Sequence, residues 1–109
     1  MLTAINDYRN YHGKHSISVD GIQNDYCKEH CWAMVRADTL YHAAPHHLNE
    51  WGEIIAMCSQ YQDWGQVERS LIAMIDNSEP HRNILLNASI IGYCVVAFRW
   101  KVFLTIRAK

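Results

Sequence analysis

Apolar residues recur along the first third of the chain at the spacing of an α-helix. Leu2, Ile5 and Tyr8 follow this spacing, which stops at Gly13, a residue suited to the position just after a helix. A second helix is predicted to begin after Asp20, a good N-cap residue. The apolar side predicted for this helix consists of Ile22, Tyr26, Cys27, His30, Ala33, Met34 and Ala37.

The remaining segments predict a loop, one more helix and three strands. Residues 38–51 contain Pro45, Asn49 and several histidines without periodicity, so we expect a loop that carries chemistry. Residues 53–58 are apolar and compatible with a strand, although a buried helical turn has the same pattern. A third amphipathic helix is predicted for 64–77, and residues 90–98 and 100–106 predict two antiparallel strands joined by a tight turn near Arg99. Helices first and strands last favour an α+β fold.

Composition favours one folded domain over residues 1–109. Half of the residues are hydrophobic, which argues against a disordered chain. The formal net charge is −1 and Lys and Arg are scattered singly, so we expect no nucleic-acid partner. No apolar run approaches the length of a membrane span. Residues 1–11 lack the apolar core of a signal peptide, so either a leader has been removed or the protein never had one.

The four cysteines are expected to be mostly free thiols. Cys27 and Cys31 lie four residues apart on a predicted helix, an awkward geometry for a disulfide. Cys58 and Cys94 could pair if their strands are neighbours. Otherwise each cysteine is expected to be a small buried hydrophobe. A cysteine nucleophile is not favoured, because nothing in the sequence marks a depressed thiol pKa.

Several separated motifs occur together in a characteristic order. They are Ile5-Asn6-Asp7-Tyr8-Arg9, Tyr41-His42-Ala43, Gly52-Glu53-Ile54-Ile55-Ala56, the run Ser78-Glu79-Pro80-His81-Arg82-Asn83-Ile84-Leu85, and Ile91-Gly92-Tyr93-Cys94-Val95. In order and spacing these motifs resemble the CAP superfamily, named for cysteine-rich secretory proteins, antigen 5 and plant pathogenesis-related proteins. The resemblance is to its short bacterial-type branch, and it covers nearly the whole chain.

This resemblance implies a fold and a site. The fold is a three-layer α/β/α sandwich, a short antiparallel sheet flanked by helices. The site is a cleft in which His42 and His81 face each other beside Glu53, with Ser78 and Arg82 as supporting residues. The chain departs from the family pattern where Ile54 replaces Asn, where Ile75 replaces Trp, and where Ser78 stands at the position of a second glutamate in animal and plant members. The cluster is therefore reduced, which puts any activity argued from the complete cluster in doubt.

Two imidazoles and a carboxylate are good ligands for Zn²⁺. If Glu53 were the third ligand, no obvious base would remain, and if Glu53 were a base, only two protein ligands would remain. We therefore expect weak, exchangeable metal binding and not hydrolysis. An equally favoured interpretation is that Glu53 and His81 form a hydrogen-bonded pair that holds the loops over the sheet.

Other residues are weaker candidates for chemistry. Cys27, His30 and Cys31 could form one corner of a soft-metal site, but no second corner of the right kind follows. His46 and His47 could bind metal or respond to mild acid, although solvent exposure is the favoured interpretation. The resemblance also permits a lipid groove, since some family members are similar to sterol or fatty-acid carriers. For the aromatic residues that could line such a groove, core packing is favoured: Trp32, Trp51, Trp64 and Trp100.

These observations favour a non-enzymatic interaction module whose cleft accepts a divalent metal or a small ligand, lipid included. One alternative is a metal-assisted hydrolase with Glu53 as base. Another is a structural component of a larger assembly, such as an extracellular matrix or a virus particle. The partner is an unknown protein or small molecule. The resemblance implies a secreted, extracellular protein, and a virion-associated or cytoplasmic location stays open.

Overall fold

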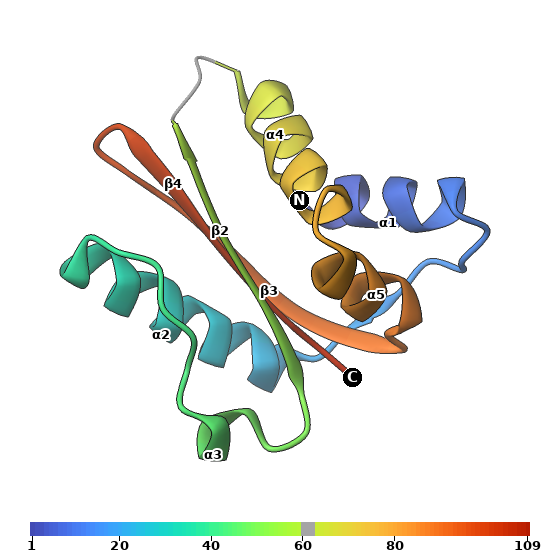
Figure 1. The fold of residues 1–109 in the computed structure, drawn as a ribbon, viewed down its shortest axis with the longest axis horizontal. Coiled ribbons are helices and arrows are strands. Elements are labelled where there is room, and N and C mark those ends of the chain that lie inside the picture. Colours follow the sequence, from blue (N-terminus) through green and yellow to red (C-terminus); the bar gives the residue numbers. More distant parts are fainter. Residues whose placement is uncertain (60–62) are drawn as a thin grey trace.

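The computed structural model describes residues 1–59 and 63–109. Within them the elements follow one another in the order α1 (Leu2–Tyr11), β1 (Ser18–Val19), α2 (Gly21–Ala37), α3 (Pro45–Leu48), β2 (Gly52–Ser59), α4 (Trp64–Asp76), α5 (Glu79–Asn87), β3 (Ile90–Phe98) and β4 (Lys101–Ala108). The helices and strands of Figure 1 therefore alternate early in the chain and end in a β-hairpin.

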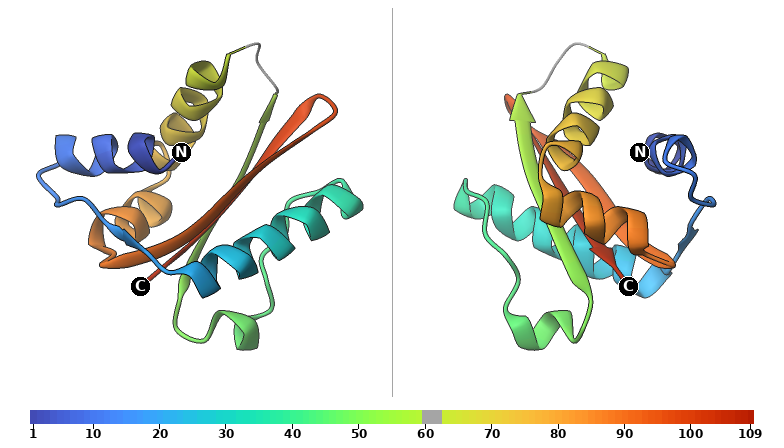
Figure 2. Two further views of the ribbon diagram at one scale, coloured as in Figure 1. Left: turned by 180° about the vertical axis from the view of Figure 1, so that it is seen from behind. Right: turned by 45° about the vertical axis from the view of Figure 1, so that its right-hand side comes forward.

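The sheet has the strand order β1-β3-β4-β2 and lies between two layers of helices. Helix α2 packs against β3 and β4, while α4 and α5 pack against β2, with α1 in contact with α4. Figures 1 and 2 show α2 on one side of the sheet and α1, α4 and α5 on the other. The predicted three-layer α/β/α sandwich is confirmed. Strands β2, β3 and β4 pair antiparallel as predicted, whereas the two-residue β1 adds a parallel pair with β3 that the sequence did not predict.

Local sequence signals located most of the elements. Helix α1 ends before Gly13, which has a φ of +76°. The Asp20 carboxylate accepts hydrogen bonds from two backbone N–H groups at the start of α2, as expected of an N-cap. Residues 53–58 belong to strand β2, and Arg99 has a φ of +57° in the turn between β3 and β4. Capping and turn chemistry thus set the boundaries that the sequence predicted.

Two local expectations differ from the structure, and one helix lies in a segment for which the sequence analysis predicted no element. The run after Ser78 forms the helix α5, with Pro80 in its first turn, where no helical hydrogen bond is lost. The predicted loop 38–51 contains the single-turn helix α3. The predicted apolar side of α2 is wrong at its first turns, because Ile22 is 67% and Tyr26 47% exposed. The residues that α2 buries are Cys27, His30, Cys31, Met34 and Val35.

Strand β4 supplies side chains to both interiors of the molecule. Leu104 and Ile106 are fully buried in the cluster beneath α1, α4 and α5, and Phe103 belongs to a second cluster beneath α2. Thr105 also lies on the α2 side, where its hydroxyl contacts Cys31. This alternation follows from the two-residue period of a strand. The hydrophobic run at the end of the chain is therefore a central strand covered on both faces.

The Asn and Arg of α1 hold the connection that follows this helix. The Asn6 side-chain oxygen accepts a hydrogen bond from the backbone N–H of Ile17 at 2.8 Å. Arg9 is buried, and its guanidinium donates to the carbonyl oxygens of His15 and Leu85. Burial lowers the pKa of Arg9. These two residues therefore have a structural role in joining α1 to α5.

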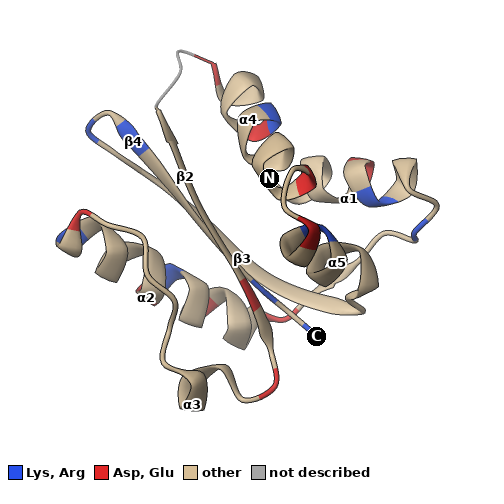
Figure 3. Ribbon diagram, in the orientation of Figure 1, with Lys and Arg blue, Asp and Glu red and all other residues tan. Residues whose placement is uncertain are grey.

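The charged residues are interspersed over the helices and strands. In Figure 3, blue Lys or Arg and red Asp or Glu occur together on α1 and on α4. Among the described residues, every helix is too short or too polar to cross a lipid bilayer.

Candidate binding cleft and neighbouring pockets

The three residues expected in the cleft come from three different elements. His42 lies in the connection between α2 and α3, Glu53 lies on β2 at the edge of the sheet, and His81 lies in the first turn of α5. The side chain of His42 is 58% exposed, whereas that of Glu53 is 1% exposed. An exposed imidazole thus stands over a buried carboxylate.

Glu53 is bonded to the segment that carries His42. Its Oε1 lies 2.7 Å from Nδ1 of His42 and accepts a second hydrogen bond from the backbone N–H of Ala43 at 3.0 Å. Because a carboxylate oxygen accepts, Nδ1 of His42 carries the proton. The expectation that Glu53 pairs with His81 is therefore corrected, because Glu53 is hydrogen-bonded to His42 and to the Ala43 backbone instead.

The surroundings of His81 lower the pKa of its side chain. Burial lowers the pKa of His81, and the charge of His42 lowers it further. Both effects favour the neutral imidazole, which is the form that binds metals.

The two residues expected to support the cleft are half-buried and act at the turn between α4 and α5. Ser78 is the N-cap residue of α5, and its carbonyl oxygen accepts from the backbone N–H of Arg82 at 2.8 Å. The Arg82 guanidinium donates to the carbonyl oxygen of Asp76 at 2.9 Å. Both therefore fix the helix that carries His81.

Two further buried residues anchor the loop of His42, and sequence reasoning did not assign them this role. Nε2 of His30 lies 2.6 Å from the carbonyl oxygen of Tyr41, so this nitrogen is the donor. Nη1 of Arg107 donates to the carbonyl oxygen of His47 at 3.3 Å. The sequence offered one signal for this role. His30 and Arg107 are polar residues at positions that the helical and strand periods place in the interior.

Glu53 and Arg107 face each other across the β2–β4 pair. Glu53 Oε2 and Arg107 Nε are both buried without a hydrogen-bond partner. The Arg107 guanidinium lies 5.0 Å from the centre of the Tyr26 ring, a cation–π geometry. Because the carboxylate and the guanidinium have opposite charges and lie opposite each other, their attraction offsets part of the free-energy cost of burying each of them. A pocket of about 320 Å³ adjoins them, lined by Tyr26, Glu29, His30, Ala33, Tyr41, Ala43, Ala44, His47 and Arg107.

The other metal-ligand candidates stay apart. Over residues 1–59 and 63–109, no three His, Cys, Asp or Glu side chains are grouped closely enough to hold a metal ion. Cys27, His30 and Cys31 belong to α2 and are buried on the side of this helix that faces the sheet. His46 and His47 are exposed, as expected. His42, Glu53 and His81 do not form such a group of three either.

All four cysteines are free thiols. The possible pair of Cys58 and Cys94 is excluded, because β4 separates their strands and the two side chains lie on opposite faces of the sheet. Cys94 has a pKa lowered to about 7, chiefly because of hydrogen bonding with Cys31. The sequence had shown no sign of a depressed thiol pKa, since Cys31 is 63 residues away.

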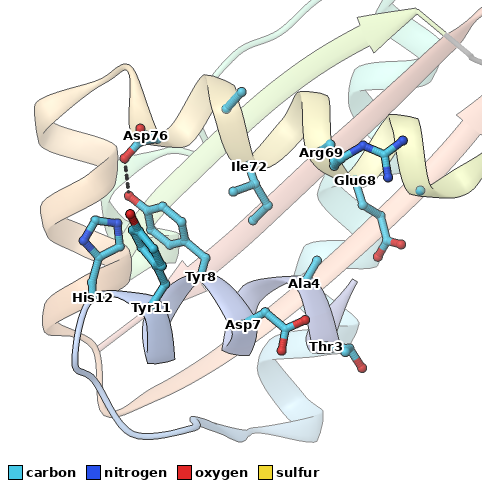
Figure 4. Close-up of a pocket in the computed structure, with 12 residues that line it drawn as sticks. Thr3, Ala4, Asp7, Tyr8, Tyr11, His12, Glu68, Arg69, Ile72 and Asp76 are labelled. Carbon is cyan, nitrogen blue, oxygen red and sulfur yellow. Dashed lines mark hydrogen bonds between the residues drawn. The ribbon is translucent and has the colours of Figure 1, made fainter.

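A groove between α1 and α4 encloses about 680 Å³ and lies apart from the cleft. Figure 4 shows the Tyr8 hydroxyl pointing at Asp76, with the rings of Tyr11 and His12 beside it. The hydroxyl donates to Asp76 Oδ1 at 2.7 Å. Burial, followed by the hydrogen bond and charge of Asp76, raises the pKa of Tyr8 to about 12. This groove combines aromatic and acidic side chains over an apolar floor that includes Ile72.

The expectation that the tryptophans pack in the core is wrong. Trp32, Trp64 and Trp100 are exposed, and Trp51 is half-buried. They do not form one groove either, since Trp32 and Trp100 line a hollow at the tip of the β3–β4 hairpin, and Trp64 lines another.

Comparison with known proteins supports the fold. No protein-family model matches the sequence, and no curated protein matches it. Among solved structures, an outer surface protein of Borrelia burgdorferi is similar, with a TM-score of 0.72 at 14% sequence identity, over 99% of this chain and 88% of that chain.

Two further solved structures carry the names of the resembled family. An extracellular protein containing an SCP domain from Bacillus anthracis has a TM-score of 0.61 at 20% identity over 96% of this chain. A cysteine-rich secretory protein from Staphylococcus aureus has a TM-score of 0.58 at 14% identity over 99% of this chain. This chain spans 38% and 36% of those two proteins. At these identities the likeness shows the fold alone, which is CAP-like.

Proposed function

We propose that this chain is a non-enzymatic binding module of the CAP type, whose cleft takes a divalent metal ion weakly through His42 and His81. The observation that carries the proposal is the hydrogen bond from His42 Nδ1–H to Glu53. Histidines that bind metals typically donate their second ring N–H to a carboxylate in this way. Because Nδ1 of His42 points its hydrogen at Glu53, Nε2 is the nitrogen that the ring offers to a metal.

The lowered pKa of His81 supports the same proposal. A neutral His81 provides a second nitrogen ligand and avoids repulsion with the bound cation. Two protein ligands are fewer than the three or four of tight zinc sites, so weak, exchangeable binding is the expectation. Water or a group from a partner completes the coordination.

The position of Glu53 argues against the alternative of a metal-assisted hydrolase. Its side chain is 1% exposed, and Oε1 already accepts from His42 and from the Ala43 backbone. A general base must reach the proton that it abstracts. Glu53 instead orients His42, which is a positioning role.

Zinc titration by calorimetry tests this proposal after chelator treatment, with thiols protected. The wild type is expected to bind about one ion per chain, and His42→Ala/His81→Ala to lose this binding. The matched control is His46→Ala/His47→Ala, which removes two exposed histidines of the same loop region and is expected to bind as the wild type does. Unchanged binding in the first double variant would contradict the proposal.

Glu53→Gln separates the positioning role from the hydrolase. Gln keeps an oxygen that can accept from His42 and Ala43 but loses the charge. We expect weaker zinc binding by about tenfold, the usual effect of changing a residue behind a ligand. Hydrolysis of a peptide substrate that is present in the wild type and absent in Glu53→Gln would favour the enzyme instead.

A location outside the cell belongs to the same proposal. The similar structures are an outer surface protein, an extracellular protein and a secretory protein. Their descriptions support this location, and detection of the chain in the culture medium or at the cell surface of its source organism would test it. A purely structural role in a larger assembly would show itself as self-association in light scattering without added metal.

A further inference from the structure

Three of the four cysteines gather on the face of the sheet that α2 covers. Cys27 and Cys31 come from α2, and Cys94 comes from β3. Cys31 Sγ lies 3.3 Å from the carbonyl oxygen of Cys94 and 3.2 Å from Thr105 Oγ1. Thr105 stands directly opposite Cys94 in the β3–β4 register, so the side chains of both residues point toward α2. Cys31 therefore meets Cys94 across the interface between helix and sheet.

The two thiols of this pair have different environments. Cys31 is fully buried, whereas Cys94 is half-buried at the margin of the cluster that contains Cys31. Hydrogen bonding with Cys31 lowers the pKa of Cys94 to about 7, and the charge of Lys28 lowers it further. The same hydrogen bonding and burial raise the pKa of Cys31. Of the two thiols, Cys94 therefore loses its proton more readily than Cys31.

We propose that Cys94 is an oxidation site at which the thiol reacts and then forms a disulfide with Cys31. The two cysteines are neighbours across the helix–sheet interface, since Cys31 Sγ contacts the backbone carbonyl oxygen of Cys94 and the hydroxyl of Thr105, the residue opposite Cys94. Cys94 has the partial exposure that an oxidant needs, and Cys31 is the resolving thiol beside it. The site is independent of the proposed metal cleft.

The chemistry is balanced with a hydroperoxide as oxidant. The Cys94 thiolate attacks one peroxide oxygen, an S–O bond forms, the O–O bond breaks, and the leaving oxygen takes a proton from water to give an alcohol or water. The product at Cys94 is a sulfenic acid. The Cys31 sulfur then attacks Cys94 Sγ, the S–S bond forms, and the hydroxyl group leaves as water with the Cys31 proton. Two thiols are oxidised and one hydroperoxide is reduced.

Other pairings fit the structure less well. Cys58 packs into the cluster on the opposite face of the sheet. Cys27 lies one helical turn from Cys31 on the same helix, which is a poor geometry for a disulfide. Burial also raises the pKa of Cys27 to about 12, so this thiol is a poor candidate for the first reaction with an oxidant.

The disulfide would link the middle of α2 to the middle of β3. The two cysteines are 63 residues apart, so the link closes a long loop and restricts the unfolded chain strongly. We expect the oxidised form to melt about 10 °C above the reduced form, which allows for some strain in the native geometry.

The experiment treats the reduced protein with hydrogen peroxide at pH 7 and maps its peptides without reduction. The expected product in the wild type is a peptide pair linked through Cys31 and Cys94, in a monomer. Cys31→Ser is expected to stop at a sulfenic acid on Cys94, which dimedone labels, and to show no rise in melting temperature. Cys94→Ser is expected to form no disulfide, and the matched control Cys58→Ser to behave as the wild type.

Two results would overturn the proposal. One is a wild type whose Cys94 stays a free thiol under peroxide concentrations that oxidise free cysteine. The other is a different linkage in the peptide map, either Cys27 to Cys31 or a bond between chains. Melting curves of the reduced variants show whether each variant folds, so that a lost linkage is not mistaken for a lost fold.

Discussion

The sheet separates two interiors that differ in composition. Beneath α1, α4 and α5 the buried side chains other than Arg9 are aliphatic, and Ile54, Leu71 and Leu104 are typical of them. On the side covered by α2, the buried residues include Thr105 and Arg107 of β4 and Glu53 of β2. Helix α2 adds His30 and two thiols to this interior. Hydrophobic burial is the main stabilising contribution to the first interior.

The second interior holds the chemistry of the molecule. Its polar residues bind the loop that carries His42, through Glu53, His30 and Arg107. Its thiols form the pair of Cys31 and Cys94. Buried polar groups are retained only where they find partners, and here the partners are the loop and one another. The comparison teaches that stability and positioning are divided between the two faces of one sheet.

The largest expected effect is on the aliphatic side. Leu104 is fully buried, so Leu104→Ala leaves a cavity between the sheet and the helices. We expect the free energy of unfolding to fall by about 2–5 kcal/mol, measured by urea denaturation. Trp100→Ala is the control, since this side chain is 83% exposed, and it is expected to change stability by less than about 0.5 kcal/mol. Similar losses of unfolding free energy in the two variants would contradict the view that the aliphatic interior supplies most of the stability.

Gly92→Ala tests how closely α2 approaches the sheet. An added Cβ would lie 2.4 Å from the backbone carbon of Gln23 and 2.7 Å from the backbone nitrogen of Asn24, neither of which can rotate away. We expect a loss of about 1–3 kcal/mol in the free energy of unfolding. Gly21→Ala is the matched control, because a Cβ there meets nothing within 4 Å. Equal stability of the two glycine variants would mean that α2 shifts at little cost.

Thr105→Val exchanges a polar for an apolar side chain on the α2 side and is expected to cost less than Leu104→Ala. The Thr105 hydroxyl accepts a hydrogen bond from Cys31, which also donates to the Cys94 carbonyl oxygen. Because one partner remains, we expect a loss of about 1 kcal/mol in the same denaturation experiment. A loss as large as that of Leu104→Ala would show that the polar side contributes equally to stability.

The smallest effect is expected in the pH dependence of stability. The folded state lowers the pKa of His81, so the unfolded chain binds more protons than the folded one as the pH falls below about 7. Protonation of His81 therefore lowers stability on acidification. His81→Asn removes this contribution, and its free energy of unfolding is expected to fall less between pH 7 and pH 5 than that of the wild type. Parallel curves for the two proteins would contradict the lowered pKa.

Local signals in the sequence determined most of the elements and the fold class. Asp20 marked the start of α2, Gly13 followed the end of α1, and the apolar runs near the end of the chain predicted β3 and β4. The order of the motifs also predicts His42, Glu53 and His81 as residues of a cleft, and this assignment stays a prediction. Such signals depend on neighbours within one or two turns of the chain, and the sequence contains them directly.

Only the tertiary structure decided how distant residues pair. It brought Glu53 into hydrogen-bonding contact with His42 and Cys31 into contact with the Cys94 backbone, and it left Trp100 exposed. Burial of Arg107 depends on a tyrosine from α2 and a loop carbonyl, both far from it in sequence. The physical reason is that a polar or aromatic side chain has the same local pattern whether it is buried or exposed, and packing between layers determines which partner it finds.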